Sequence, residues 1–399
     1  MTALLDTVPI IDVDTHVSEP ADLWTSRMSK RWGDATPHVI FDDAAQMLKW
    51  KIGDRVMSPV AINCMAGHSE YVPSRPASLE EADPACTDPK ARLRRMDEYG
   101  VAMNLLYPNI WGFDSHVFLE VGTDYALDCL RAYNDFLTEW AGEDPTRLVP
   151  LATLPFWDMD AAVAEMIRCR EMGHRGINLA AEFRLIGFPD VIEPIWAPVL
   201  AAAQDLGMPV NFHIGFSRRA AKIVRKPGQE DVPYTRSDYV RLITPGFLFN
   251  GQAIANVICS GLCERYPQLS FVSVESGVTW VPFLLQALDW QWMSAGAFKD
   301  HPERLLPSEY FERQVYMTWW FEKIHPDTLT KYADNIMYET DFPHPTAQAP
   351  GPASPAVRAR DFVKDNLAGI SDDIVRKVLY GNAERLYGIS VAGANGAAG

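Results

Sequence analysis

An aspartate and a histidine, Asp14 and His16, stand two residues apart in the stretch 10–20. The apolar run at residues 8–13 leads into this pair, a pattern typical of a buried strand. Successive side chains of a strand point to opposite faces, so these two point the same way. A carboxylate and an imidazole at one strand end are able to hold a divalent metal. The pair alone is equally consistent with a histidine that bonds a neighbouring carboxylate.

The same side-chain types recur after later apolar runs, as His213, Glu275 and Asp341. Burying such groups costs free energy unless they are paired or bind a metal. One divalent ion shared by several strand ends explains the whole set. A mixture of imidazole and carboxylate ligands suits zinc, manganese or iron.

Strands must position these residues, and eight apolar runs predict them. The runs lie near residues 10, 103, 151, 177, 210, 272, 316 and 337. Predicted helices, among them 159–171 and 246–265, separate most of them. Such alternation indicates parallel strands buried on both faces, so we predict an α/β fold, a (β/α)₈ TIM barrel. Chemistry in this fold takes place at the carboxyl ends of the strands. No G-x-G-x-x-G motif follows the first strand, which argues against a dinucleotide-binding sheet.

We expect one barrel domain over residues 1–388. Residues 27–84 stand between the first strand and the first barrel helix, which is predicted at 90–99 and ends at Gly100. Two strand-like runs, 39–41 and 47–52, predict a hairpin there, and we interpret the region as an inserted cap. Residues 389–399 are rich in Gly and Ala and are predicted to form a flexible tail.

Composition and charge limit the classes of partner that the chain is expected to bind. The chain of 399 residues is 48% hydrophobic, enough for a core, and its formal net charge is −16. This charge argues against nucleic acid and anionic membranes as partners, and leaves a small molecule. We find no apolar run that predicts a membrane span and no secretory signal, so we expect a cytoplasmic protein. The six cysteines are scattered, and we expect them to be free and buried.

Five motifs carry a resemblance to a known family. They are Asp14-Thr15-His16-x-x-Glu19-Pro20, Asn211-Phe212-His213, Val274-Glu275-Ser276-Gly277, Glu339-Thr340-Asp341-Phe342-Pro343-His344 and Gly381-Asn382-Ala383-Glu384-Arg385-Leu386-Tyr387-Gly388. Together they resemble the amidohydrolase superfamily, over almost the whole chain and in the family's order. More narrowly, the pattern is similar to the branch that contains aminocarboxymuconate-semialdehyde decarboxylase and γ-resorcylate decarboxylase. The resemblance implies a barrel of the metal-dependent hydrolase type.

The resemblance also implies one metal ion, held by Asp14, His16, His213 and Asp341. We expect zinc, with manganese and iron as alternatives, and Asp341 as the proton-transfer group. Two features depart from the family pattern. Many relatives have His-x-His or Glu-x-His at the first motif, and many carry a catalytic histidine where Glu275 stands. No lysine stands at the fourth strand end as a bridging ligand, so a two-metal site is not expected.

Two further residues are candidates for catalysis. Glu275 either orients or deprotonates water, binds a hydrogen-bond donor of the substrate, or accepts a hydrogen bond from a histidine that holds the metal. His344 either contacts substrate or begins the helix that follows. Glu19 is either a further ligand or a residue that holds its loop.

Substrate-binding candidates are aromatic or cationic. Trp24 and Tyr107 either wall an aromatic pocket or pack in the core. Arg218 and Arg219 either clamp a substrate carboxylate or form a solvated pair on their loop.

The function predicted is a metal-dependent, non-oxidative decarboxylase of a small aromatic or unsaturated carboxylic acid. The alternative is a metal-dependent hydrolase of an amide, ester, lactone or carbon–carbon bond, and a third reading is a non-catalytic metal-binding barrel. We expect a homodimer. Its interface would draw on tryptophans that otherwise belong to the core, namely Trp280, Trp290, Trp292, Trp319 and Trp320.

Overall fold

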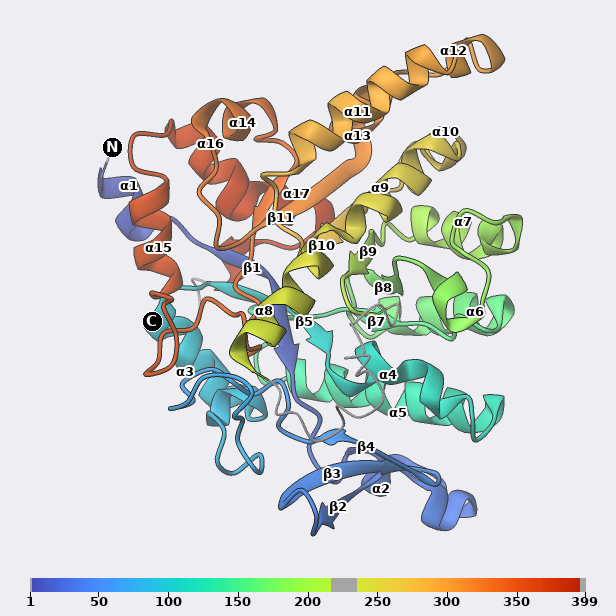
Figure 1. The fold of residues 1–399 in the computed structure, drawn as a ribbon, viewed down its shortest axis with the longest axis vertical. Helices are drawn as coiled ribbons and strands as arrows, with labels where there is room; N and C mark the ends of the chain where they lie inside the picture. The colour runs from blue at the N-terminus through green and yellow to red at the C-terminus, as the bar shows by residue number, and fades with distance from the viewer. Residues whose placement is uncertain (1, 217–234, 395–399) are drawn as a thin grey trace.

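The computed structural model describes residues 2–216 and 235–394, and its centre is built from parallel strands (Figure 1). One sheet has the order β1-β5-β6, and a second has the order β12-β11-β10-β9-β8-β7. The strands are β1 (Ile11–Val17), β5 (Met103–Pro108), β6 (Leu148–Pro150), β7 (Ala152–Thr153), β8 (Ile177–Ala180), β9 (Val210–His213), β10 (Phe271–Val274), β11 (Val315–Trp319) and β12 (Ile336–Tyr338). The predicted parallel arrangement is therefore confirmed.

The two sheets adjoin each other at both ends. Only Leu151 separates β6 from β7. At the other end, the backbone amide of His16 donates to the carbonyl of Phe342 at 2.7 Å, and the amide of Asp341 donates to the carbonyl of Asp14 at 3.0 Å. The strands thus follow one another in chain order from β1 to β12 and back to β1, which is the order that a β/α barrel requires. The hydrogen bonds between neighbouring strands are divided between the two sheets.

Helices separate the strands. Between β4 (Arg55–Pro59) and β10 the chain forms α3 (Pro89–Tyr99), α4 (Ile110–Phe118), α5 (Thr123–Ala141), α6 (Met159–Glu171), η3 (Phe183–Ile186), η4 (Pro194–Trp196), α7 (Ala197–Asp205), α8 (Arg236–Ile243), η5 (Thr244–Leu248), α9 (Asn250–Cys259) and α10 (Leu262–Arg265). The remainder are α11 (Val281–Ser294), α12 (Ala297–Asp300), α13 (Pro307–Gln314), α14 (Pro326–Lys331), α15 (Ala359–Asn366), α16 (Asp372–Arg376), η6 (Lys377–Gly381), α17 (Asn382–Tyr387) and α18 (Val391–Ala394), with α1 (Thr2–Thr7) and α2 (Leu23–Arg27) near the N-terminus.

Local chemistry sets the ends of α3, the first barrel helix. The Asp88 carboxylate accepts hydrogen bonds from the amides of Lys90 and Ala91, and Pro89 occupies the first helical position. Gly100 ends the helix at φ 76°, a left-handed conformation that favours glycine. The next strand, β5, begins three residues later and places Asn109 just beyond its carboxyl end.

An inner apolar cluster fills the space enclosed by the strands. It includes Val13, Leu105, Val272 and Met337, all buried, and the C-terminal Tyr387 packs with it. The Tyr387 hydroxyl donates to the Asn211 side-chain oxygen at 2.7 Å. The C-terminal helix α17 is therefore joined to the strand β9, which carries His213.

Residues 27–84 contain a three-stranded antiparallel sheet, β2 (His38–Asp42), β3 (Met47–Ile52) and β4 (Arg55–Pro59), preceded by η1 (Lys30–Ala35). The sheet lies next to α2, α4 and α5 (Figure 1). The predicted hairpin is confirmed as β2 and β3. The third strand was not predicted because it is short and ends in a proline. The turn η2 (Pro84–Cys86) leads back to the barrel.

The helix predicted over residues 246–265 is interrupted. Its first part is the turn η5, and Gly261 at φ 83° separates α9 from α10. The stretch Arg236–Cys259 is also long and apolar enough to cross a membrane by length and composition alone. Core helices of soluble proteins meet the same criterion, and Ala253, Ile254 and Val257 of α9 are buried in the core.

The C-terminal tail was predicted to be flexible over residues 389–399, and its flexibility stays a prediction. Residues Val391–Ala394 form the short helix α18. The amide of Val391 donates to the Glu384 carboxylate at 2.7 Å, and its side chain is buried. Composition alone does not indicate this bond or this apolar contact. Residues 395–399 lie outside the described part of the chain.

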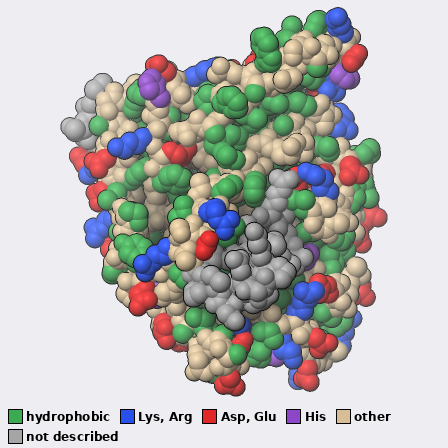
Figure 2. All heavy atoms as spheres, viewed as in Figure 1, with side chains coloured by type: hydrophobic (Ala, Val, Ile, Leu, Met, Phe, Trp, Pro, Cys, Tyr) green, Lys and Arg blue, Asp and Glu red, His purple; other side chains and the backbone are tan. Residues whose placement is uncertain are grey.

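The five tryptophans proposed for an interface differ in burial, and Trp280 and Trp292 are half-buried. Trp319 and Trp320 are fully buried, so they belong to the core. Trp290 is 71% exposed on α11, and Phe283 on the same helix is 78% exposed. This helix extends away from the strands with α12 at its end, and Figure 2 shows apolar side chains over the same part of the surface.

Candidate metal centre and cavity

The structure brings the four predicted metal ligands together. Asp14 and His16 come from β1, His213 ends β9, and Asp341 follows β12. Nε2 of His16 lies 3.5 Å from Oδ1 of Asp14 and 3.5 Å from Oδ1 of Asp341. Nε2 of His213 lies 3.5 Å from Oδ2 of Asp14. All four side chains are fully buried. Their possible ligand atoms form two groups that share His16, one with Asp14 and His213 and one with Asp341 and His344.

Backbone carbonyls fix the tautomers of the two histidines. Nδ1 of His16 lies 2.9 Å from the carbonyl of Pro108, and Nδ1 of His213 lies 2.7 Å from the carbonyl of Ile214. A carbonyl only accepts, so each Nδ1 carries a proton, and in the neutral form of each ring Nε2 has a free lone pair. The two Nε2 atoms are 3.0 Å apart. Two lone pairs that face each other at this distance suit a shared cation.

The environment of the Asp14 carboxylate also indicates a cation site. Neither of its oxygens has a hydrogen-bond donor among the described residues, although both are buried. Burial raises the pKa of Asp14, because a carboxylate without solvent or a counter-charge is costly. Two imidazole nitrogens and carboxylates from Asp14 and Asp341 form a donor set that fits zinc, manganese or iron.

Two acidic residues of the site have strained backbones. Asp341 has φ 60° and Glu275 has φ 54°, values that L-residues other than Asn and Asp rarely adopt. Asp12 helps to hold the first of these turns. Its carboxylate accepts from the amide of Thr340 at 2.9 Å and from the Thr340 hydroxyl at 2.5 Å. Two of the three non-glycine residues with positive φ in the described part of the chain thus carry carboxylates of this centre, and the third is Gln46 in the turn between β2 and β3.

His344 connects Asp341 to a polar chain. Its Nδ1 lies 2.7 Å from Oδ1 of Asp341, and its Nε2 lies 2.8 Å from Oδ1 of Asn109. Asn63 also donates to that oxygen, at 3.0 Å, and the Asn109 amide donates to the hydroxyl of Ser18. Because Oδ1 of Asn109 only accepts, Nε2 of His344 carries a proton. Burial lowers the pKa of His344, so the ring is neutral and its Nδ1 faces Asp341 without a proton. Burial raises the pKa of Asp341 well above its usual range.

Glu275 lies on the Nδ1 side of the His213 ring, whereas Asp14 lies on its Nε2 side. Its Oε2 lies 3.5 Å from Nδ1 of His213, and its side chain faces the cavity. Burial raises the pKa of Glu275 to about 8. Beneath it, the buried Glu339 accepts a hydrogen bond from the Glu275 amide at 3.2 Å. Burial, and then the charge of Asp14, raise the pKa of Glu339 well above its usual range.

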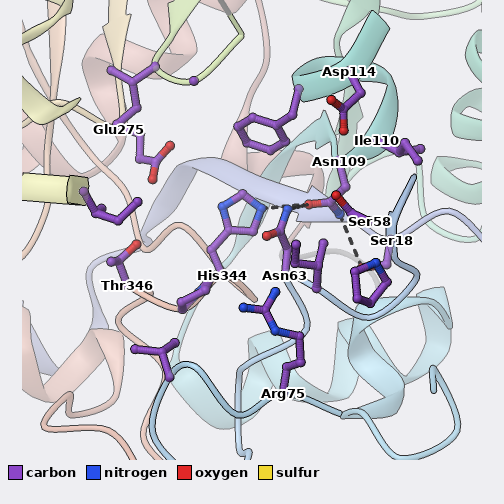
Figure 3. A pocket seen from close by; sticks show the side chains of 18 of the residues that line it. Ser18, Ser58, Asn63, Arg75, Asn109, Ile110, Asp114, Glu275, His344 and Thr346 are labelled. Carbon is purple, nitrogen blue, oxygen red and sulfur yellow. Dashed lines mark hydrogen bonds between the residues drawn. The ribbon is translucent and has the colours of Figure 1, made fainter. Parts of the chain in front are cut away.

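A cavity of about 490 Å³ lies beside this centre (Figure 3), and the four predicted metal ligands are not among its described lining residues. Glu275 and His344 lie at its inner side. Phe113 of α4 and Phe249 contribute apolar wall, and residues 58–75 of the 27–84 region line another side. The volume is typical of a pocket for one small molecule.

The two aromatic candidates do not line this cavity. Trp24 is fully buried, donates its indole N–H to the carbonyl of Cys129 at 3.0 Å and packs against Trp50. Tyr107 is also fully buried, with its ring centroid 5.2 Å from that of His213. Both therefore follow the core-packing alternative. Arg218 and Arg219 lie outside the described residues.

Glu19 follows the loop-holding alternative. Its Oε1 accepts from the backbone amides of Asn109 and Trp111, at 3.1 and 3.5 Å, where α4 begins. It lies at the cavity, and burial raises its pKa to about 7. The contacts of Glu19 are with the start of a helix, and it is absent from both groups of possible metal ligands found among the described residues.

Four cavity or network residues were not among the predicted site residues. Asn109 had a usable signal, because it follows a buried strand directly. Glu339 had a similar signal, two residues before Asp341. Asn63 and Arg75 had none, since they lie in a Pro- and Ser-rich segment whose path across the cavity depends on the tertiary fold.

The family profile and the curated relatives that match this chain agree with one another. The amidohydrolase family profile matches residues 11–389. γ-Resorcylate decarboxylase of Polaromonas sp. is 24% identical over 74% of this chain and 86% of its own length. The 2-amino-3-carboxymuconate-6-semialdehyde decarboxylase of Dictyostelium discoideum is 23% identical over 73% of this chain and 77% of its own length.

Solved structures resemble the fold along most of the chain. An amidohydrolase from Mycobacterium avium subsp. paratuberculosis matches with a TM-score of 0.75 and 20% identity, over 95% of this chain and 99% of that one. 5-Carboxyvanillate decarboxylase from Sphingomonas paucimobilis matches with a TM-score of 0.64 and 21% identity, over 96% and 100%. A dihydroxybenzoic acid decarboxylase from Polaromonas sp. was solved with manganese and the inhibitor 2-nitroresorcinol. It matches with a TM-score of 0.57 and 19% identity, over 95% of this chain and 97% of that one.

Proposed function

The chain belongs to the amidohydrolase family and is an enzyme, and from this premise we propose that it is a metal-dependent, non-oxidative decarboxylase. The substrate is a small aromatic or unsaturated carboxylic acid. The observation that carries the proposal is the pair of Nε2 lone pairs of His16 and His213, 3.0 Å apart, beside the protonatable Asp341. We further propose that the fold is a (β/α)₈ barrel of one domain, with residues 27–84 as its cap.

Asp14, His16, His213 and Asp341 would hold the ion. When bound, a divalent ion supplies positive charge that attracts a carboxylate or hydroxyl of the substrate and withdraws electron density from it. Zinc has no particular support. We propose manganese as the ion to test first, because two related decarboxylases, from Polaromonas sp. and Novosphingobium aromaticivorans, were solved with it.

Asp341 is the proposed proton donor. In the reaction the bond between the ring or vinyl carbon and the carboxyl carbon breaks, and its electron pair stays on the former. That carbon takes a proton from the Asp341 carboxyl, and carbon dioxide leaves. Oδ1 of Asp341 lies 2.7 Å from Nδ1 of His344, and a proton from solvent restores the Asp341 carboxyl group after the product leaves. Asn109 holds Nε2 of His344 in the protonated form, which directs Nδ1 towards Asp341.

The apolar walls contribute by excluding water. Phe113 contacts the rings of both His213 and His344, at centroid distances of 5.8 and 5.7 Å. An apolar environment beside the ion favours loss of the charged carboxylate as neutral carbon dioxide.

Hydrolysis is the competing reaction, because Glu275 lies within reach of the centre and its pKa of about 8 suits a general base. The test loads the protein with manganese and supplies a panel of ¹³C-carboxyl acids, including 2,6-dihydroxybenzoate and 5-carboxyvanillate. Labelled carbon dioxide is measured by mass spectrometry. A parallel panel of amides, esters and lactones is run in H₂¹⁸O.

We expect labelled carbon dioxide from at least one acid and no ¹⁸O-labelled products. His213→Ala should lose both the metal and the activity, whereas the same change at the exposed His325 should lose neither. Hydrolysis products without carbon dioxide would contradict the proposal. So would full activity in the wild-type protein after chelation.

A further inference from the structure

Asn63 connects the region of residues 27–84 to the residues beside the metal centre. Its Nδ2 donates to Oδ1 of Asn109 at 3.0 Å, and the same oxygen accepts from Nε2 of His344 at 2.8 Å. Figure 3 shows Asn63 and His344 converging on Asn109. Asn109 and His344 are buried, and Asn63 is half-buried on the wall of the cavity. One acceptor oxygen thus joins this region to the histidine that contacts Asp341.

The segment that carries Asn63 is held against the loop that carries His344. The backbone amides of Met65 and Ala66 both donate to the carbonyl of Pro343, at 2.8 and 3.1 Å. Pro343 directly precedes His344 in the chain. The place of Asn63 beside His344 is therefore set by backbone hydrogen bonds, which a change of the Asn63 side chain leaves intact.

The side-chain amide of Asn109 has neighbours that accept either of its two directions, with one exception. Its Nδ2 donates to the Ser18 hydroxyl at 3.3 Å, and a hydroxyl both donates and accepts. A nitrogen of a neutral imidazole donates or accepts according to the tautomer. Asn63 is the remaining side-chain partner of this amide among the described residues, and it presents a donor. A donor there requires Oδ1 of Asn109 on this side, and Oδ1 in turn requires a proton on Nε2 of His344.

We propose that Asn63 is a positioning residue, which fixes the direction of the Asn109 amide and through it the nitrogen of His344 that carries the proton. With that proton on Nε2, Nδ1 of His344 is an acceptor 2.7 Å from Oδ1 of Asp341. An acceptor at this place lets Asp341 keep a carboxyl proton there, which an N–H would displace. The inference rests on the proposed function, in which Asp341 supplies the proton, and adds a residue of the 27–84 region to that step.

The test reads the tautomer of His344 and needs no turnover. Asn63→Asp presents only acceptors, and Asn63→Leu presents neither a donor nor an acceptor. Ser58→Asp is the matched control, because it adds a carboxylate at a lining residue that is not among the described partners of Asn109. Each full-length protein is labelled with ¹⁵N-histidine and loaded with zinc, which is diamagnetic. Long-range ¹H–¹⁵N spectra distinguish a protonated ring nitrogen from a bare one, and the signals of His344 are identified by their loss in His344→Gln.

In the wild type we expect the proton of His344 on Nε2. Asn63→Asp should turn the Asn109 amide around and move the proton to Nδ1. Asn63→Leu should give a mixture of the two tautomers, and Ser58→Asp should match the wild type. Unchanged signals of the other histidines show that each variant is folded. The wild-type tautomer in Asn63→Asp would overturn the proposal, as would a reversed tautomer in Ser58→Asp.

The rate is the second readout. On the best acid of the panel, kcat of manganese-loaded Asn63→Asp should fall by about tenfold or more, because a positioned proton-transfer group commonly contributes at least that much. An unchanged kcat together with a reversed tautomer would overturn the positioning role. The proposed function fails by a separate result, the absence of carbon dioxide release by the wild type.

Discussion

At the scale of single residues, the site is defined by protons whose positions the hydrogen bonds dictate. Two carbonyls place protons on Nδ1 of His16 and His213, and one amide oxygen places a proton on Nε2 of His344. The remaining nitrogens are directed at the centre. The chemistry of this site thus depends on atoms that are not themselves reactive, above all Oδ1 of Asn109.

Glu19 gives a prediction about pH. Burial raises its pKa from 4.5 to about 7, so the folded protein binds this proton more tightly than the unfolded chain does. Its contribution to stability is therefore complete below pH 4.5 and is lost as the pH rises through about 7. In Glu19→Gln the side chain stays neutral, and the amide oxygen still accepts from Asn109.

We expect urea unfolding of the metal-free wild type to show a free energy that falls between pH 5 and pH 8. Glu19→Gln should fall less steeply and gain on the order of 2 kcal/mol over the wild type at pH 8. Glu171→Gln, at an exposed position, is the control and should follow the wild type. Parallel curves for wild type and Glu19→Gln would refute the buried-acid account.

The four proposed metal ligands could be placed together from sequence, because polar residues at the ends of apolar strands have no other economical explanation, and their role stays a prediction. Trp24 was not assigned correctly, since its indole finds a carbonyl in α5 that only the tertiary fold brings near. Arg75 was missed for the same reason. Side chains on strands inherit their direction from the alternation of the strand, whereas those on long loops do not.

At the scale of elements, α4 and the turn after β9 are packed too closely for larger residues. A Cβ at Gly112 of α4 would lie 2.4 Å from the ring of Phe216. That ring stacks on His213 with a centroid distance of 4.5 Å. The spacing of these two elements therefore sets the position of a metal ligand.

Gly112→Ala should accordingly push Phe216 against His213. We expect a loss of about 1–3 kcal/mol in unfolding free energy, typical of an overpacked core, together with weaker manganese binding. Chemical unfolding and a calorimetric titration with manganese measure the two effects. Gly246→Ala is the matched control, because its added Cβ meets nothing within 4 Å. Unchanged stability and metal affinity in Gly112→Ala would show that this packing is not needed.

Elements with strong local signals were predicted closely. The helix α6 has the bounds predicted for it, Met159–Glu171, with Asp158 as its N-cap. The helix predicted at 246–265 was wrong, since Gly261 breaks it in a left-handed conformation that the apolar pattern does not reveal. Likewise α18 depends on a bond from Val391 to Glu384, a contact that composition does not indicate.

At the scale of the whole molecule, α11 exposes apolar side chains that a monomer leaves in water. Phe283, Trp290 and Met293 are 78%, 71% and 51% exposed. Exposed apolar patches commonly mark protein interfaces. We therefore predict a homodimer that uses α11. Trp290→Glu should shift the mass measured by light scattering from dimer towards monomer, while Gln286→Glu, an exposed control on the same helix, should not. A monomeric wild type would contradict this prediction.

The central claim, decarboxylation with Asp341 as proton donor, is tested most directly by the product formed in D₂O. The manganese-loaded enzyme is given the best acid of the panel, and mass spectrometry counts deuterium in the product, with an enzyme-free incubation as background. We predict one deuterium per carbon dioxide released, at the carbon that lost the carboxyl group, and neither product from Asp341→Asn at comparable metal content. Full release of carbon dioxide by Asp341→Asn would contradict the account.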